Sequence, residues 1–138
     1  MAATSPLGAA LERVGDRWSL LVIEALLDGP RRFTELTAAV TGIAPNILSD
    51  RLRRLEAERV IQASPYTDRP RRVVYALTAE GQELAGALRL LADWGGRVAR
   101  DAEPIRHASC GTPVDARWYC PTCERPIERP EADELRFV

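Results

Sequence analysis

Apolar side chains recur every three or four residues through the first part of the chain, a spacing typical of amphipathic helices. This spacing predicts four helices, over residues 7–15, 17–27, 34–40 and 45–58. Asp16 and Thr34 are residue types that cap helix N-termini, and Pro45 suits a first helical turn. The second helix is apolar nearly all round, so we expect it to be buried.

The apolar spacing then shortens to two residues, which is typical of strands. Residues 60–63 and 72–77 are the predicted strands, and the segment 64–70 between them is rich in turn-forming residues and predicts a loop. Thr78 can cap a long helix over residues 79–100. The pattern therefore predicts a mainly α fold with one small β-hairpin.

The C-terminal segment differs in composition from the rest of the chain. From residue 107 onward it is rich in Cys and Pro, and it has too few large apolar residues to build a core alone. We expect a domain over residues 1–100, a linker over 101–106 and a small module over 107–138. No stretch approaches the roughly 18 apolar residues of a membrane span, and no secretory signal begins the chain, so a cytoplasmic protein is expected.

Charge is distributed unevenly along the chain, although the net charge is only −1. Residues 1–30 carry −2, residues 31–76 carry +4 and residues 77–138 carry −3. All 19 basic residues are Arg, for which biased codon usage is a simpler explanation than selection for phosphate contacts. The basic middle segment is where we expect an anionic partner such as a nucleic acid to bind.

The predicted order of helices followed by a basic-tipped hairpin is that of a winged helix-turn-helix. A helix fits the major groove of DNA, where polar side chains on its outer face can meet base edges. The outer face of the fourth predicted helix carries Pro45, Asn46, Ser49, Asp50 and Arg53. Asn favours adenine and Arg favours guanine, so Asn46 and Arg53 are expected to carry most of the base discrimination.

Further arginines outside this helix are candidates for contacts with the DNA backbone or the minor groove. They are Arg32 before the third helix and Arg69, Arg71 and Arg72 at the hairpin tip. A merely solvated surface would be the simpler explanation of the fourth helix alone, but these arginines, together with Arg31, favour DNA binding. For Arg51 and Arg54, phosphate contacts and intramolecular ion pairs are both open.

Several blocks of sequence, taken in order, resemble one known family. They are GDRWSLLVI from residue 15, RRFTEL from residue 31, GIAPNILSDRLRRL from residue 42, the wing from Tyr66 to Gly81, and Trp94-Gly95. Over residues 5–100 the chain resembles the HxlR-type transcriptional regulators, a branch of the MarR-like winged-helix proteins. The resemblance implies a homodimer that binds a double-stranded DNA operator with an inverted repeat.

The resemblance also implies that the N-terminal helix and the long helix 79–100 form the dimer interface. Apolar residues such as Leu91 and Trp94 support this independently, although they could instead cover the winged-helix core. Ser5 stands where many relatives have a cysteine, which some of them use to sense oxidants or electrophiles, so thiol switching is not expected at this position. A small-molecule effector could bind between the dimer helices and the core, but no residue pattern marks its pocket.

The histidine and the cysteines form two short pairs, His107-x2-Cys110 and Cys120-x2-Cys123, separated by nine residues. This spacing is typical of a structural Cys3His zinc site, with Zn–S distances of ~2.3 Å. Zinc binding would also supply the folding free energy that the segment lacks. A redox pair at Cys120 and Cys123, with zinc release as its signal, is an alternative. A catalytic zinc is disfavoured, because the single histidine is already needed as a ligand.

Two other classes of function are weighed against operator binding. A winged helix with a zinc ribbon also occurs in transcription components that bind polymerase, and the acidic C-terminal half leaves such a role open. The basic wing, together with Asn46 and Arg53, favours operator binding. An enzyme has little support, because no catalytic triad is available once His107 binds a metal and no Gly-rich phosphate loop is present.

Overall fold

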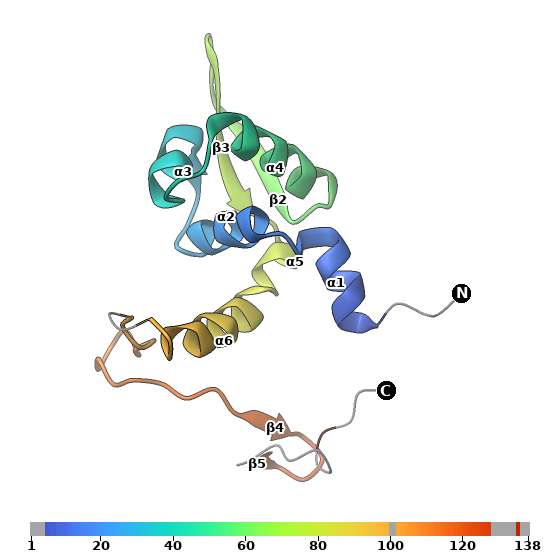
Figure 1. The fold of residues 1–138 in the computed structure, drawn as a ribbon, viewed down its shortest axis with the longest axis vertical. Helices are drawn as coiled ribbons and strands as arrows, with labels where there is room; N and C mark the ends of the chain where they lie inside the picture. Colours follow the sequence, from blue (N-terminus) through green and yellow to red (C-terminus); the bar gives the residue numbers. More distant parts are fainter. Residues whose placement is uncertain (1–4, 100–101, 128–134, 136–138) are drawn as a thin grey trace. The chain divides into compact units, whose positions relative to one another are not determined.

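The computed structural model describes residues 5–99, 102–127 and 135 of the 138-residue chain. The chain divides into two compact units, residues 1–88 and 89–138, and each is described by itself. Figure 1 shows the helices and the long hairpin of the first unit and the short strands of the second. The division into residues 1–100, 101–106 and 107–138 stays a prediction.

The first unit contains the predicted helices in the predicted order. They are α1 (Pro6–Val14), α2 (Arg17–Leu27), α3 (Phe33–Ala39), α4 (Pro45–Ala57), α5 (Ala79–Gln82) and the start of α6 (Ala85–Gly96). Asp16 caps α2 as predicted, because its carboxylate accepts a hydrogen bond from the Ser19 amide at 3.0 Å. Pro45 lies in the first turn of α4, also as predicted.

The predicted cap of the third helix is wrong. α3 begins at Phe33, so Thr34 lies inside the helix and Arg32 is the residue that precedes it. The Glu35 carboxylate accepts a hydrogen bond from the Arg32 amide at 2.6 Å. A glutamate three residues into the helix therefore satisfies a free donor at this end, which is half of a capping box.

A three-stranded antiparallel sheet joins the hairpin to the segment before α3. It consists of β1 (Arg31–Arg32), β2 (Ile61–Asp68) and β3 (Arg71–Leu77), in the order β1-β3-β2. The register pairs Val74 of β3 with Arg32 on one side and with Ser64 on the other. Each strand of the hairpin therefore runs out to a narrow turn at residues 69 and 70.

The loop predicted over residues 64–70 is mostly strand. Pairing continues through Pro65 opposite Val73 and ends at Asp68 opposite Arg71, with a bulge between Pro65 and Thr67. Because β2 is an edge strand, Pro65 can lie in it even though proline has no amide hydrogen to donate. The wing is consequently a long ribbon whose tip carries the predicted arginines.

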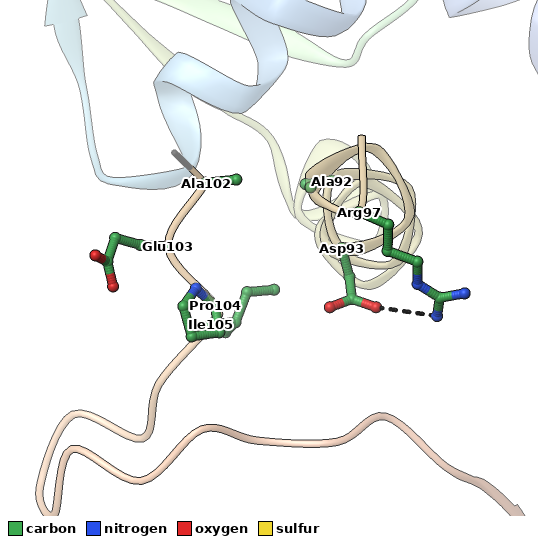
Figure 2. Close-up of a pocket in the computed structure, with 8 residues that line it drawn as sticks. Ala92, Asp93, Arg97, Ala102, Glu103, Pro104 and Ile105 are labelled. Carbon is green, nitrogen blue, oxygen red and sulfur yellow. Dashed lines mark ion pairs between the residues drawn. The ribbon is translucent and has the colours of Figure 1, made fainter. Parts of the chain in front are cut away.

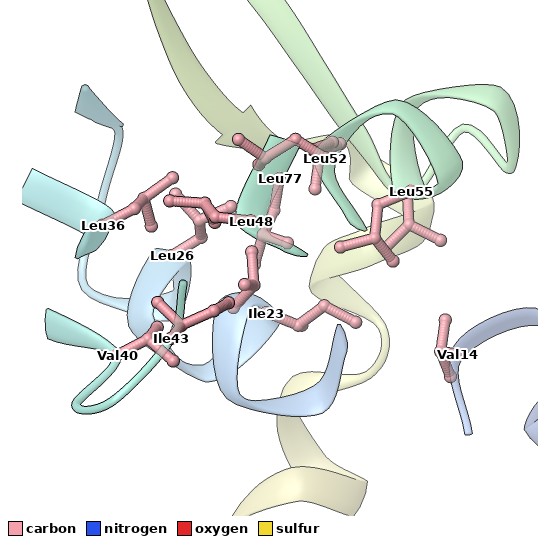
Figure 3. Close-up of a cluster of buried hydrophobic side chains, with 13 residues drawn as sticks. Val14, Ile23, Leu26, Leu36, Val40, Ile43, Leu48, Leu52, Leu55 and Leu77 are labelled. Carbon is pink, nitrogen blue, oxygen red and sulfur yellow. The ribbon is translucent and has the colours of Figure 1, made fainter. Parts of the chain in front are cut away.

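The core of the first unit is built around α2. Val22, Ile23 and Leu26 of this helix are at most 1% exposed, which confirms that α2 is buried. The predicted apolar seam of α4, at Leu48, Leu52 and Leu55, packs into the same cluster (Figure 3). Burial of one side of α4 leaves its opposite side free for another role.

The helix predicted over residues 79–100 is interrupted. α5 ends at Gln82 and α6 begins at Ala85, and between them the Leu84 amide bonds to the Gly81 carbonyl at 3.1 Å, a tight i→i+3 turn. Gly81 lies so close to the residue before β2 that a Cβ atom there would overlap the Val60 carbonyl oxygen. α5 is thus held against the start of β2.

The second unit contains the rest of α6 and a small two-stranded sheet. β4 (Trp118–Cys120) pairs with β5 (Arg125–Ile127) in antiparallel register, and an isolated bridge joins Arg106 to Pro113. Across the described residues, every helix is too short or too polar to cross a membrane.

Candidate nucleic-acid interface and metal-ligand turns

The outer face of α4 is open, as the recognition helix of a winged helix-turn-helix requires. Pro45, Asn46, Asp50 and Arg53 are exposed, and Ser49 is half-buried. Four of the five predicted residues are therefore exposed on α4, and Ser49 is partly covered.

A shallow hollow lies between this side of α4 and the sheet. It is lined by Phe33, Ser49, Leu52, Arg53, Glu56 and Tyr75. Burial, with a smaller contribution from the nearby Glu56 carboxylate, raises the pKa of Tyr75, so its phenol stays neutral at ordinary pH. Arg53 thus lines a hollow of mixed polar and apolar character, together with Tyr75 of the wing.

Two arginines of α4 point back into the molecule. Arg51 Nε donates to Asp16 Oδ1 at 2.8 Å, and an Arg54 guanidinium nitrogen donates to the Glu12 carbonyl at 2.8 Å. For Arg51, the structure favours an intramolecular ion pair over a phosphate contact. Arg54 bonds mainly to the backbone, and its guanidinium lies 4.0 Å from the Asp16 carboxylate.

Asp16 is the centre of this junction between α2 and α4. Its carboxylate is partly buried, which by itself raises the pKa of the group. Hydrogen bonds from the Ser19 hydroxyl and amide and from Arg51 outweigh this effect and lower the pKa of Asp16 to about 2. The carboxylate is therefore charged at all ordinary pH values.

Arg13 makes a second junction that the sequence did not predict. Its guanidinium donates to Glu58 Oε2 at 2.9 Å, to the Glu58 carbonyl at 2.7 Å and to Glu80 Oε1 at 2.7 Å. These bonds tie α1 to the end of α4 and to α5. Their partners are 45 and 67 residues away in sequence, and no local pattern signals them.

Arg53 and the arginines at the base and tip of the wing differ from Arg51, because they have no acidic partner in the part of the chain that the structure describes. Within the described residues, no Asp or Glu forms an ion pair with Arg53 or with the arginines at the base and tip of the wing. The arginines at the base and tip of the wing are Arg32, Arg69, Arg71 and Arg72, and all four are exposed. Figure 1 shows the hairpin of β2 and β3 projecting beyond α3 and α4. The positive charges of these arginines are therefore available to an anionic partner.

Arg32 makes a contact with Tyr66 that the sequence did not predict. Its guanidinium carbon lies 5.3 Å from the centre of the Tyr66 ring. Tyr66 lies at the bulge of β2, so the two residues meet across the base of the wing.

In the second unit, the first predicted ligand pair lies in a tight turn. His107 Nδ1 is 3.3 Å from Cys110 Sγ, and the Gly111 amide donates to the His107 carbonyl at 2.8 Å. Gly111 has a φ of 72°, a left-handed conformation that glycine adopts without strain. Hydrogen bonds from the Thr112 hydroxyl and amide lower the pKa of Cys110.

The second predicted pair lies in a similar turn, between β4 and β5. Hydrogen bonds from the Cys123 amide and thiol and from the Thr122 amide lower the pKa of Cys120. Glu124, the residue after Cys123, has a φ of 52°. Each pair is thus followed by one residue in the left-handed region.

The structure does not gather the two pairs into one cluster. Among the residues it describes, no three His, Cys, Asp or Glu side chains lie close enough together to hold a metal ion. His107 is near Cys110, and Cys120 is near Cys123. The four-ligand zinc site stays a prediction.

A hollow also lies beside the C-terminal half of α6 (Figure 2). The ion pair between Asp93 and Arg97, with an N–O distance of 3.6 Å, lies on one wall, and Pro104 and Ile105 lie on another. The predicted dimer helix therefore borders a small mixed surface, part charged and part apolar.

Residues 13–103 match the sequence model of a known family, which is described as HxlR-like helix-turn-helix. The chain belongs to the HxlR-like helix-turn-helix family. The match includes the core, α4 and the wing, and it ends just before the two predicted ligand pairs. The resemblance identified from the sequence is confirmed for the winged helix-turn-helix part.

Relatives of this HxlR-family chain are also regulators. An uncharacterized helix-turn-helix transcriptional regulator of Mycobacterium tuberculosis (strain H37Rv) is 39% identical over 124 residues, which cover 87% of this chain and 78% of the relative. The transcriptional regulator YodB of Bacillus subtilis is 29% identical over 97 residues, which cover 70% and 87%. The HxlR-family chain is therefore a DNA-binding transcriptional regulator, as predicted, and not an enzyme.

Solved structures resemble the HxlR-family chain over different lengths. HypR, a redox regulator in its reduced form, has a TM-score of 0.63 and 30% identity, covering 70% of this chain and 95% of HypR. The protein PA1607 has a TM-score of 0.79 and 29% identity, covering 99% of this chain and 95% of PA1607. The likeness to PA1607 thus extends into the segment that carries the ligand turns.

Proposed function

We propose that this regulator binds an inverted-repeat operator as a homodimer, with α4 in the major groove and the wing on the neighbouring backbone or minor groove. The observation that carries the proposal is the sorting of arginines in the first unit. Arg13, Arg31, Arg51 and Arg54 are bonded within the protein. Of the other arginines in this unit, which form no ion pair within the described residues, Arg53 lies on α4, Arg32 on β1 and Arg69, Arg71 and Arg72 on the wing, while Arg17 and Arg59 lie outside this surface.

Roles follow from where each side chain lies. Asn46 and Arg53 are assigned to base edges in the major groove, where Asn pairs best with adenine and Arg with guanine. Ser49 and Asp50 lie on the same face, and Pro45 leads the helix into the groove. The backbone contacts are assigned to Arg32, Arg69, Arg71 and Arg72.

The dimer is proposed from exposed apolar residues on the two helices predicted to form it. Leu7 and Leu11 of α1 are 68% and 50% exposed, and Leu91 and Trp94 of α6 are 52% and 66% exposed. Large apolar side chains at this density are typical of a surface that a second copy covers. A regulator of transcription acts where the chromosome is, so we place this dimer in the cytoplasm. A small-molecule effector of the dimer stays a prediction.

The test is selection of bound duplexes from a random DNA library by the purified, full-length protein, with its mass in solution measured alongside. We expect a dimer that enriches an inverted repeat whose half-sites lie about one helical turn apart. A monomer, or a protein that enriches no sequence and binds only weakly at low salt, would contradict the proposal. The second outcome would favour a transcription component that works by binding polymerase.

A structural zinc ion in the C-terminal module is the second proposal. Its support is the likeness of the two turns. In each turn, local hydrogen bonds lower the pKa of one cysteine, and the residue after the second ligand is left-handed. Such turns fit thiolate ligands, because these hydrogen bonds stabilise the negative sulfur. His107, Cys110, Cys120 and Cys123 would hold one ion per chain, whose role is to bring the turns together and fold the module.

Removing one ligand tests the zinc proposal. Cys123→Ser is expected to abolish binding of one zinc ion per chain, measured by elemental analysis, and to remove the thiolate-to-metal absorption of the cobalt-loaded protein. Thr122→Ser, in the same turn, is the control and should retain both. Full metal retention in Cys123→Ser would show that the ligand set is wrong, and a cysteine disulfide in place of metal would favour the redox alternative.

A further inference from the structure

Tyr66 lies at an irregular position of the wing. The bulge between Pro65 and Thr67 leaves Tyr66 outside the pairing of β2 with β3, and bulges of this kind change the direction of a side chain. Tyr66 is 45% exposed, although aromatic residues usually contribute most to stability when they are buried. The core of the first unit therefore does not account for this tyrosine.

The ring of Tyr66 meets the guanidinium of Arg32. The distance from the guanidinium carbon to the ring centre is 5.3 Å, within the range in which a cation is attracted by the electrons of an aromatic face. Arg32 comes directly before α3, on the strand that pairs with β3. The contact thus spans the sheet at the base of the wing.

The neighbouring Arg31, unlike Arg32, is bonded within the protein. Arg31 Nε donates to the Ala25 carbonyl at 2.6 Å, and its guanidinium lies 3.7 Å from Asp28. Arg32 has no such acidic partner among the described residues, and its backbone amide is already satisfied by Glu35. The stacking on Tyr66 is what the structure provides for the Arg32 side chain.

We infer that Tyr66 is a positioning residue for DNA binding, whose ring holds the Arg32 guanidinium at the base of the wing for contact with a backbone phosphate. The inference rests on the proposed contact between the wing and DNA. A guanidinium stacked on a ring keeps its N–H donors free at its edge, where a phosphate can accept them. Holding the long side chain in place beforehand lowers the entropy lost when it binds.

A double-mutant cycle on the full-length protein tests this inference. Operator affinity is measured over a range of salt concentrations for wild type, Tyr66→Phe, Tyr66→Leu, Arg32→Ala and the double variant. We expect Tyr66→Phe to bind like wild type and Tyr66→Leu to bind about two- to five-fold more weakly, the equivalent of the ~0.5–1 kcal/mol of an exposed cation–π pair. With Arg32→Ala already present, Tyr66→Leu should have no further effect.

The results of this cycle distinguish a Tyr66 that positions Arg32 from a Tyr66 that only supports the fold. A tyrosine that only supports the fold would weaken binding equally with and without Arg32, so additive losses would overturn the inference. So would a loss of binding in Tyr66→Phe, which keeps the ring. The same cycle with Arg31→Ala is the control and should be additive. Wild-type protein that binds no operator would overturn the proposed function together with the inference, whereas an operator-binding protein with no coupling overturns the inference alone.

Discussion

At the scale of single residues, the role of an arginine is decided by its partners and not by its place in the sequence. Arg51 and Arg53 are two positions apart on the same helix. Arg51 points inward to Asp16, whereas Arg53 is exposed on the face assigned to the major groove. The sequence could place both on α4 from its apolar seam, but it could not show which one had an acidic partner 35 residues away.

These two arginines predict different defects. Arg53→Ala is expected to remove the preference for one base of the operator, at a cost of ~1–3 kcal/mol in binding free energy. Arg51→Ala should instead lower the free energy of unfolding and leave the base preference unchanged. The measurement compares the affinities of each variant for the operator and for operators changed at single positions. An Arg53→Ala protein with wild-type preferences would refute the base contact.

Asp16 predicts a pH dependence of stability. Its pKa falls from an ordinary value of 3.8 to about 2 on folding, so its contribution is fully present above about pH 4 and is lost as the pH falls toward 2. Asp16→Asn should therefore cost about 1–2 kcal/mol near pH 7 and much less near pH 2, as measured by urea unfolding. Asp28→Asn is the control, because the Asp28 side chain is 83% exposed and lies 3.7 Å from Arg31. An equal loss of unfolding free energy in Asp16→Asn at both pH values would show that the negative charge of Asp16 does not stabilise the fold.

At the scale of elements, local sequence signals predicted most helix ends. The start of α3 is set by the nearby Glu35, whereas the two larger differences depend on the sheet. Asp16, Gly15 and Pro45 act within one turn, so their effects can be predicted from neighbouring residues alone. The helix expected over residues 79–100 is broken because α5 packs against Val60, a contact that no helical pattern shows. The wing extends through Pro65 because this proline lies on an edge strand, which the sequence does not reveal.

The length of the wing leads to a prediction about salt. Arg71→Ala and Arg72→Ala are each expected to weaken binding to operator and to unrelated duplexes alike, because an arginine bound to a phosphate reads no sequence. The slope of log affinity against log salt concentration should flatten by about one for each phosphate that the variant no longer binds. Arg97→Ala removes an exposed arginine of the second unit and should leave the slope unchanged. An unaltered slope in both wing variants would exclude the wing from the interface.

At the scale of the whole molecule, exposed apolar side chains are the feature that a single chain does not explain. The family resemblance implied that the N-terminal helix takes part in a dimer interface, and Leu7 and Leu11 of α1 are exposed. The sequence also predicted four metal ligands, and the two turns that carry them are formed separately. Spacing alone predicts which residues could take part, but it does not show whether the two turns meet or whether a second copy covers α1, because both depend on surfaces that lie apart in one chain.

A dimer that presents two copies of α4 predicts a strict dependence on the spacing of operator half-sites. Two recognition helices related by a twofold axis reach successive major grooves on one side of the duplex only if the half-sites are ~10 bp apart. Inserting about half a helical turn, roughly 5 bp, places the second half-site on the opposite side of the DNA. The affinity should then fall to that of a single half-site. Leu91→Glu, which puts a charge on the exposed face of α6, should give the same low affinity on the unaltered operator, because it separates the two copies. Equal binding to both operators by a protein that remains a dimer in solution would show that one chain makes all the DNA contacts.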